Sequence, residues 1–390
     1  MPERGARLNS RADGGPLPSR SEAAIASVEE REALRADALG LGFLQVGFAP
    51  AAAPPHAEAY LDWLRRGHNG DMGWMAREDS VRRRMDPREA LSGCQTLVMV
   101  SMGYAAEPGD SAAPPAADPE DPRRPRIARY AVGRDYHLEF EDRLARLVAL
   151  IHDRWPSAEV KRYVDYGPVL EREHAQRAGL GWVGKNTMLI HPELGSWTLL
   201  GEVLTTVAIA PDAPFEADRC GTCIRCMEAC PTGAIIGPRD LDARRCISYQ
   251  TIELRGSIPE PLRPGIGNRV FGCDICQEVC PWNDGARGGE RSSLPATWGG
   301  PVSPDTMASW AEELLDLSDD GFLARYGETP LARPGRSGLL RNLCVGLGNS
   351  GDTAAVPVIM RCFDEPSPVV REHAAWALAR LAGARLQGSL

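Results

Sequence analysis

Eight cysteines between residues 220 and 280 constrain this chain more than any other feature of its sequence. They fall into two runs of related spacing, Cys220-x2-Cys223-x2-Cys226-x3-Cys230-Pro231 and, after Cys246, Cys273-x2-Cys276-x3-Cys280-Pro281. The first run has the spacing of bacterial ferredoxins, whose fourth cysteine, followed by proline, reaches a neighbouring cluster. The pattern therefore predicts two [4Fe–4S] clusters rather than one.

The spacing also predicts which thiolates share a cluster. One cluster takes Cys220, Cys223, Cys226 and Cys280, and the other takes Cys230, Cys246, Cys273 and Cys276. The alternative is zinc, which paired CxxC motifs bind through four thiolates. Eight cysteines in two such runs, each closed by a proline, favour iron and sulfur. The cysteines outside the pattern lie on apolar stretches and are predicted to be small buried side chains: Cys94, Cys344 and Cys362.

Length and composition place these clusters in a globular protein with its own hydrophobic core. The 390 residues predict two or three domains, and 43% hydrophobic with 25% charged residues is the usual balance for such chains. No apolar run approaches the ~18 residues that span a bilayer, and the first twenty residues lack the apolar centre of a secretory signal. We therefore expect a cytoplasmic protein. The net charge of −9 argues against a wholly basic protein that coats nucleic acid, but it is compatible with a local basic face.

Residues 22–210 alternate predicted helices with predicted strands, which indicates an α/β (α+β) domain. Helical spacing of apolar residues predicts helices over 22–39 and 136–155. Apolar runs predict strands over 42–48, 96–104, 161–165 and 197–209. Two segments are predicted to lie outside this core, a disordered tail over 1–21 and a surface insertion over 105–126.

Two further domains follow. Residues 211–300 are rich in Cys, Pro and Gly, so bound metal is expected to hold this ferredoxin-like domain together. Residues 301–390 are predicted to form a linker and an all-α segment. The six acidic residues and no base over 301–320 indicate a solvated helix and linker. Residues 340–352 align with 371–383, which resembles a HEAT-type helical pair.

Outside the cysteines, the segment around Asp165 holds the densest candidate chemistry. Asp165 stands at a predicted strand end before a Gly-Pro turn, where a partly apolar pocket would make it a proton donor. The alternative is an N-cap for a helix over 168–178. The glycines of 178–182 would let a flat ligand approach the backbone. Only Lys161 and Lys185 are lysines among 44 basic residues, which makes both more interesting than ordinary surface charges.

Three motifs occur in one order along the chain. They are DYGPVLEREHAQRAGLGWVGKN, the paired runs CGTCIRCMEACPTGAI and CDICQEVCPWN, and the HEAT-like tail. Together they resemble the epoxyqueuosine reductase family over residues 22–390, although this chain has DYGPVLE where the family pattern is DSAPVLE and carries the 105–126 insertion. The resemblance implies a cobalamin cofactor, reduced through the clusters to cob(I)alamin. It also implies reduction of the epoxide of epoxyqueuosine, at position 34 of tRNA, to queuosine.

The resemblance further implies roles for single residues. Asp165 matches the family's proton donor. Contacts with the corrinoid are implied for Asp165 itself and for Arg77, Ser248, Arg255, Cys273 and Asp274. No protein side chain is expected to bind the cobalt, so the remaining candidates are interpreted as solvated or capping histidines: His137, His174 and His191.

The implied substrate is a tRNA with a queuosine-type anticodon (Tyr, His, Asp or Asn). An unidentified low-potential donor would supply the electrons, and the protein is expected to be a monomer. An acidic protein needs a local basic face to bind tRNA. Candidates are the arginines of 123–130 with Arg336, Arg341, Arg371 and Arg380. The alternatives are a reductive dehalogenase-like corrinoid enzyme, a ferredoxin-type electron-transfer module and a tRNA-binding scaffold. Bound corrinoid would exclude the electron-transfer module.

Overall fold

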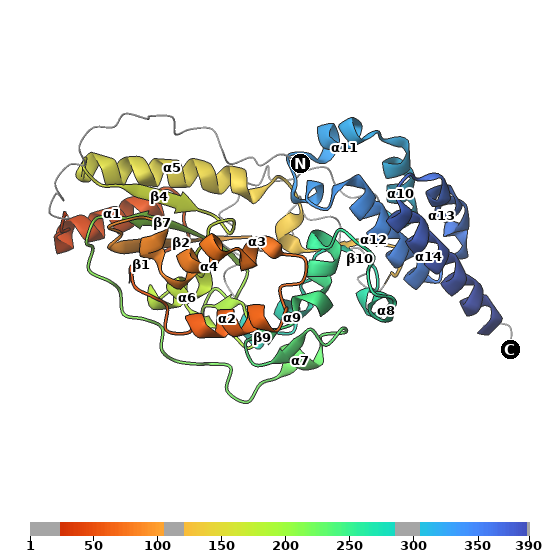
Figure 1. Ribbon diagram of the computed structural model, residues 1–390, viewed down its shortest axis with the longest axis horizontal. Helices are drawn as coiled ribbons and strands as arrows, with labels where there is room; N and C mark the ends of the chain where they lie inside the picture. The colour runs from red at the N-terminus through yellow and green to blue at the C-terminus, as the bar shows by residue number, and fades with distance from the viewer. Residues whose placement is uncertain (1–23, 105–120, 285–304, 388–390) are drawn as a thin grey trace.

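The computed structural model describes residues 24–104, 121–284 and 305–387 (Figure 1). The predicted N-terminal tail and most of the predicted insertion lie outside these described residues. At the centre of the N-terminal domain is a four-stranded sheet of order β1-β2-β7-β4. Its strands are β1 (Gln45–Pro50), β2 (Thr96–Gly103), β7 (Thr198–Thr205) and β4 (Val160–Tyr163).

Every neighbouring pair in this sheet is antiparallel. The domain is therefore of the α+β type, although the alternation of helices and strands along the sequence is typical of parallel sheets. All eight residues of β2 are buried, as expected for a strand with both neighbours paired and both faces covered. Each of the four predicted strands is present, with bounds that differ by at most four residues.

Helices cover both faces of the sheet (Figure 1). On one face lie α1 (Val28–Gly40) and α5 (Tyr136–Arg154), packed on alternate residues of β1 and β2. On the other face lies α6 (Glu171–Arg177). The α1 helix begins later than predicted because the Ser27 hydroxyl and the Glu30 carboxylate form a capping box. The α5 helix begins where predicted, with Asp135 as its N-cap.

Short elements connect the sheet to the cysteine-rich region. Before β2 come α2 (Ala57–Arg65), α3 (Gly73–Ala76) and α4 (Glu78–Met85). The hairpins pair β5 (Trp182–Val183) with β6 (Leu189–Ile190), and β8 (Ile235–Gly237) with β9 (Asp240–Leu241). The cysteine runs surround α7 (Arg225–Glu228) and α9 (Ile275–Glu278), and β10 (Arg269–Phe271) pairs in parallel with β3 (Arg126–Ile127). A π-helical turn, Tyr249–Glu253, precedes α8 (Arg263–Ile266).

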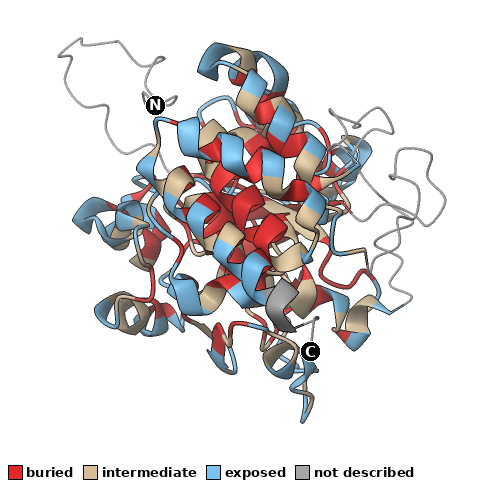
Figure 2. Ribbon diagram, turned by 90° about the vertical axis from the view of Figure 1, so that its right-hand side faces the viewer, coloured by how far each residue is buried: buried red, intermediate tan, exposed pale blue. Residues whose placement is uncertain are grey.

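The C-terminal segment is a layer of helices with one apolar core. It contains α10 (Met307–Asp316), α11 (Asp319–Tyr326), α12 (Gly335–Ser350), α13 (Val356–Arg361) and α14 (Pro368–Gln387). Figure 2 shows the buried residues gathered in the middle of this end of the molecule, with exposed turns around them. Among the described residues, no helix combines the length and apolar character needed to cross a membrane.

A solvated helix and linker were predicted over 301–320, and this segment does contain the helix α10, but α10 is not solvated on all sides. Met307, Trp310 and Leu314 of this helix are fully buried in the C-terminal core. Their helical spacing places them on one face, so the acidic residues that dominate the composition occupy the opposite face. The composition of a short segment hides such a division because it averages the two faces.

Candidate functional site

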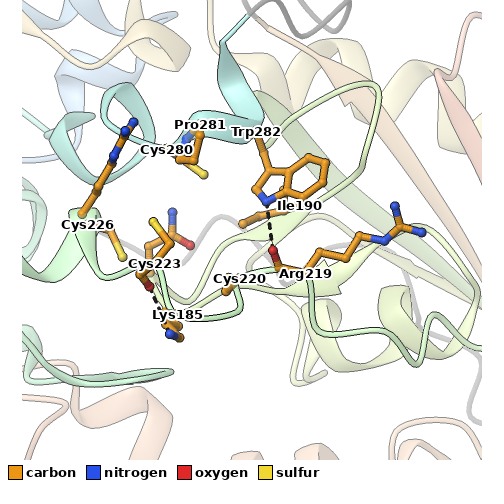
Figure 3. A pocket seen from close by; sticks show the side chains of 11 residues that line it. Lys185, Ile190, Arg219, Cys220, Cys223, Cys226, Cys280, Pro281 and Trp282 are labelled. Atoms are coloured by element: carbon orange, nitrogen blue, oxygen red, sulfur yellow. Dashed lines mark hydrogen bonds between the residues drawn. The ribbon is translucent and has the colours of Figure 1, made fainter.

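A cavity of about 380 Å³ lies between the loop at residues 219–226 and the β5–β6 hairpin (Figure 3). Four cysteines line it, and they are the four predicted to share the first cluster: Cys220, Cys223, Cys226 and Cys280. Their thiols come from both cysteine runs, which lie far apart in the sequence. The walls are completed by apolar side chains, of which Ile190 and Trp282 are examples. Four convergent thiols around a cavity of this size fit a [4Fe–4S] cluster.

Lys185 fixes the loop that carries two of these cysteines. Its Nζ donates hydrogen bonds to the carbonyl oxygens of Gly221 (2.6 Å) and Cys223 (3.0 Å). The Trp282 indole N–H donates to the Arg219 carbonyl at 3.3 Å (Figure 3). One of the two lysines singled out in the sequence is thus part of the cluster site, whereas the Nζ of Lys161 donates to the Ala90 carbonyl, away from the cysteines.

The second set of cysteines gathers beside the first. Burial, and to a lesser extent the neighbouring Cys246 thiol, raise the pKa of Cys273 to about 12. Burial also raises the pKa of Cys276, and the Cys246 and Cys273 thiols act in the same direction. Cys246 in turn interacts with Cys230. Neighbouring thiols of this kind all become thiolates only beside strong positive charge, which a bound iron cluster supplies. Interaction between Cys276 and Cys226 of the first set places the two sets next to each other.

Asp165 is presented on a strained turn at the end of β4. Its φ is +43°, a left-handed conformation that is uncommon for residues other than glycine. The backbone N–H of Tyr166 donates to the Val164 carbonyl, which closes a turn centred on Asp165. The α6 helix begins at Glu171 after Leu170, without a side-chain cap, so the alternative role of Asp165 as an N-cap was wrong.

Two side chains from the first turn of α5 hold the Asp165 carboxylate. The Tyr136 hydroxyl donates to Oδ2, and Nε2 of His137 lies 3.0 Å from Oδ1. The other ring nitrogen of His137 lies 2.6 Å from a carboxylate oxygen of Asp135. Burial lowers the pKa of His137, but its hydrogen bonds with Asp135 and Asp165 outweigh burial and raise the pKa to about 10.

His137 was not predicted as a partner of Asp165. The interpretation as a solvated or capping residue was wrong, since this ring connects two carboxylates. The only local signal was the Asp-x-His spacing at the start of the helix. His174 is buried instead on α6, where burial, followed by the charge of Arg177, lowers its pKa to about 3. His191 lies in the turn after β6, and its Nδ1 accepts the Glu193 backbone N–H.

The residues implied as corrinoid contacts lie on segments that meet near Asp165. Arg77 is exposed at the start of α4, and Arg255 is exposed after the π-helical turn that follows Ser248. The Tyr249 hydroxyl accepts the Asp71 backbone N–H at 2.8 Å, which joins the segments that carry Arg77 and Arg255. Asp274, beside Cys273, is buried and accepts the Arg129 backbone N–H at 2.7 Å.

Arg333, from the C-terminal segment, reaches the same region and was not found from the sequence. Its guanidinium binds the Glu253 carboxylate at 2.6 Å, at the end of the π-helical turn. It also lies 5.9 Å from the centre of the Trp74 ring and interacts electrostatically with Asp165. The C-terminal helices thus contribute a side chain to the surface that carries Asp165. Only a long-range contact brings it there, so no local pattern could have indicated it.

The arginines expected to form a basic face are mostly paired or buried. Arg341 is 1% exposed and donates to the carbonyls of Gln250, Leu254 and Gly256. Arg336 binds Glu365, and Arg371 donates to the Glu365 and Pro366 carbonyls. The expectation for Arg341 was wrong because this residue anchors α12 to the loop after the π-helical turn. Within the C-terminal set, Arg380 is exposed, over the Trp376 ring.

The glycines of residues 178–182 serve the fold rather than an open ligand surface. Gly181 has a φ of +153°, and a Cβ there would stand 2.3 Å from the Ile190 carbonyl oxygen. Gly179 has a φ of +78°, and its Cβ would stand 2.9 Å from the Ala213 carbonyl. Both glycines therefore permit close approach of backbone to backbone, and the expectation of a flat ligand here is not supported.

Relatives of known activity cover most of the chain. The epoxyqueuosine reductase of Pseudomonas aeruginosa is 43% identical over 87% of this chain and 91% of its own length. That of Escherichia coli is 39% identical, over 88% and 87%. A crystal structure of epoxyqueuosine reductase with an epoxyqueuosine-modified tRNA-Tyr stem loop matches 90% of both chains at 30% identity, with a TM-score of 0.80. A Bacillus subtilis structure matches with a TM-score of 0.78 at 29% identity and 90% coverage of both chains; its catalytic aspartate loop is swung out of the active site.

Two family models match parts of the chain that contain the site. Residues 219–283 match the 4Fe-4S double cluster binding domain, and residues 84–166 match Epoxyqueuosine reductase QueG, DUF1730. The fold and the two sets of thiols thus define an iron–sulfur oxidoreductase. With relatives of 39–43% identity along most of its length, the chain belongs to the epoxyqueuosine reductase family.

Proposed function

We propose that this protein reduces the epoxide of epoxyqueuosine, at wobble position 34 of tRNA, to the alkene of queuosine. Removal of the epoxide oxygen as water needs two electrons and two protons. The position of Asp165 carries the proposal: its carboxyl group is half-exposed on a strained turn and interacts with Arg333. Arg333 also contacts Glu253 and Trp74, which lie on the segments that carry Arg255 and Arg77. Family membership and the tRNA-bound relative support the choice of substrate.

The proposal assigns electrons to the two sets of cysteines. Each set would hold one [4Fe–4S] cluster, in the grouping given above, and the match to the double cluster domain supports this number. Lys185 and Arg225 line the first cavity, whose cluster would receive single electrons from a low-potential donor. The second set adjoins Asp274, and Tyr130 interacts with both Asp274 and Asp165. The electrons would thus pass from the first cluster to the second.

The proposal assigns a corrinoid to the surface between these clusters and Asp165. Bound there as cob(I)alamin, cobalamin would supply a two-electron nucleophile for the strained epoxide carbon. Arg77, Ser248 and Arg255 would hold it from one side and Cys273 with Asp274 from the cluster side. These segments already meet through the hydrogen bond between Tyr249 and Asp71, which supports a shared site for a large ligand.

Asp165 would donate the proton that the opening epoxide oxygen takes up. Tyr136 and His137 orient its carboxylate, and the protonated imidazole of His137 would return a proton to it for the loss of water. The aspartate loop of the Bacillus subtilis relative has a swung-out position. We propose that the turn around Asp165 is the corresponding loop, and that it must occupy the position seen here for proton transfer.

The remaining parts of the proposal concern partners. A tRNA with a queuosine-type anticodon would bind across Asp165 and the C-terminal helices. These helices would form a HEAT-like pair. The enzyme would act in the cytoplasm as a monomer.

The proposed function is tested by anaerobic incubation of the purified protein with cobalamin, a low-potential reductant and tRNA that carries epoxyqueuosine. Mass spectrometry of the digested tRNA should show loss of one oxygen from this nucleoside. An Asp165→Ala variant with intact clusters should form product about 10²- to 10⁴-fold more slowly. Loss of oxygen at equal rates in both proteins would remove Asp165 from the reaction, and no loss in the wild type would overturn the choice of substrate.

A further inference from the structure

The turn that presents Asp165 is attached to α5 at a second point, one residue beyond the carboxylate. The hydroxyl group of Tyr166 donates a hydrogen bond to Oε1 of Glu141, on α5. The other carboxylate oxygen of Glu141 accepts a hydrogen bond from Nε of Arg162, on β4, at 3.0 Å. One carboxylate therefore joins the turn, the helix and the strand that precedes the turn.

The backbone of this turn needs such support because its conformation is unfavourable. The backbone N–H of Tyr166 donates to the carbonyl of Val164, two residues before it, and Asp165 between them has a φ of +43°. Three-residue turns with a positive φ at the central residue are rare and strained. A strained backbone persists only where its surroundings hold it. Side-chain contacts of the turn therefore determine whether the Asp165 carboxylate keeps its position.

The hydrogen bonds of the Asp165 carboxylate itself cannot hold the turn equally well throughout a proton transfer. Its two oxygens contact the Tyr136 hydroxyl and Nε2 of His137. A protonated carboxyl group accepts fewer hydrogen bonds than a carboxylate, so these contacts weaken when Asp165 carries a proton. The hydrogen bond from Tyr166 to Glu141 uses neither oxygen of Asp165, and it is therefore independent of this proton.

The residue after Tyr166 is closely packed. A Cβ added to Gly167 would stand 2.5 Å from the side chain of Tyr163, and Arg84 donates to the Gly167 carbonyl at 3.2 Å. The chain is thus held on this side of the turn. A movement of Asp165 would have to be taken up between these two points, at Tyr166.

The ring of Tyr166 makes contacts that are separate from those of its hydroxyl group. Its centre lies 6.0 Å from that of the His137 ring, with 29° between the planes, and 6.3 Å from that of Tyr163, at 83°. Tyr166 is nevertheless 55% exposed. Removal of the hydroxyl group alone should therefore leave the rings and the protein core in place.

We propose that Tyr166 is a positioning residue whose hydrogen bond to Glu141 keeps the Asp165 turn in place during proton transfer. The hydrogen bond fixes the turn to α5, the helix whose first turn also carries the partners of the Asp165 carboxylate. The inference rests on the proposed function, because it concerns the residue assigned there as proton donor. Tyr166 acts through Asp165 and needs no contact with the reacting atoms.

Hydrogen exchange of the full-length protein, with its clusters bound, tests this without substrate. Tyr166→Phe removes the hydroxyl group and keeps the ring, Glu141→Ala removes the acceptor, and Glu141→Gln keeps a neutral acceptor. Asp142→Ala, at the exposed neighbouring position of α5, is the control. Peptides that cover residues 164–170 are followed at short labelling times, after correction for intrinsic exchange rates, with peptides from β2 as the reference for global opening.

Tyr166→Phe and Glu141→Ala should each exchange residues 164–170 about tenfold faster than the wild type, as expected for loss of one hydrogen bond to a charged group. The double variant should be no faster than either single variant, because both changes remove the same bond. Glu141→Gln should be slower than Glu141→Ala, and Asp142→Ala should match the wild type. Unchanged exchange in Tyr166→Phe, or additive effects in the double variant, would overturn the proposal.

Reduction of tRNA that carries epoxyqueuosine then measures the consequence for the reaction. Tyr166→Phe should lower kcat about tenfold with an unchanged KM for tRNA, because the bond holds the proton donor and not the RNA. A raised KM with an unchanged kcat would overturn the positioning role and assign Tyr166 to tRNA binding. The expected exchange without any reduction of this tRNA by the wild type would overturn the proposed substrate and support the role of Tyr166 in holding the turn.

Discussion

The sheet domain and the cysteine region meet at one site, yet different forces hold them. The sheet domain has two continuous apolar cores, one on each face of the strands. The cysteine region has two small apolar clusters, and both use residues from elsewhere: Trp182 and Ile190 from the β5–β6 hairpin, and Val345 from α12. The cysteine region therefore depends on its neighbours and on the clusters proposed for it, whereas the sheet domain is stabilised by its own packing.

Removal of one cluster ligand should give the largest effect and separate the two regions most clearly. We expect Cys226→Ala to lose about four of about eight iron atoms and to abolish product formation, while the sheet domain keeps its unfolding transition. Iron analysis and thermal unfolding followed by circular dichroism measure both effects. Cys94→Ala is the matched control, because this buried cysteine lies outside the cluster pattern. Full iron content in Cys226→Ala would contradict the assignment of this ligand.

Arg341→Met should have the next largest effect and lower the free energy of unfolding, because it removes hydrogen bonds between α12 and the cysteine region. The variant leaves the carbonyls of Gln250, Leu254 and Gly256 without their donor. With about 1–3 kcal/mol for each unsatisfied buried group, we expect a loss of about 3 kcal/mol or more. Urea unfolding measures it, with Arg380→Met, an exposed arginine of the same segment, expected within about 0.5 kcal/mol of the wild type. Equal midpoints for the two variants would show that this anchor is dispensable.

Lys185→Met should weaken the first cluster alone. Its two hydrogen bonds to the Gly221 and Cys223 carbonyls are worth about 1–3 kcal/mol, so iron release to a chelator should proceed in two phases, with the first accelerated about tenfold or more. Lys161→Met is the control, since its Nζ binds the Ala90 carbonyl in the sheet domain. A single unchanged phase would mean that the loop keeps its shape without Lys185.

His137→Gln should have an effect on stability that is confined to the sheet domain and depends on pH. The pKa of His137 is about 10 in the folded protein against an ordinary value of 6.5, so the folded state binds the extra proton more tightly. This stabilisation is fully present below pH 6.5 and is lost as the pH rises through 10. The difference in Tm between wild type and variant should therefore be largest in acid and shrink towards pH 10. A constant difference would place the effect of His137 in packing rather than charge.

The sequence predicted those parts of the site that are encoded by local spacing. The grouping of Cys220 with Cys280, and of Cys230 with Cys276, follows from the ferredoxin spacing. In the structure Cys220 and Cys280 line one cavity, and Cys246 interacts with both Cys230 and Cys276. The position of Asp165 after a strand follows from a short apolar run and a Gly-Pro pair. Such features depend on neighbours a few residues away, so a single sequence is sufficient to find them.

The parts that the sequence did not predict depend on contacts between distant segments. His137 meets Asp165 across 28 residues, and Arg333 meets Glu253 across 80. Tyr166 likewise meets Glu141 across 25 residues. Similarly, the antiparallel order of the sheet depends on which strands pair, and this is decided by packing of both faces rather than by any one strand.

The anchor between α12 and the loop over 249–256 also bears on how this protein can be divided and recombined. Besides Arg341, the amide of Asn342 donates at 2.8 Å to the carbonyls of Thr251 and Val270. These partners are backbone carbonyls, so the side chains of this loop can vary, whereas its backbone conformation cannot. A chimera that takes its C-terminal helices from a relative would therefore have to import this loop along with them. The boundary suitable for such exchange lies before the loop, not at the start of the helices.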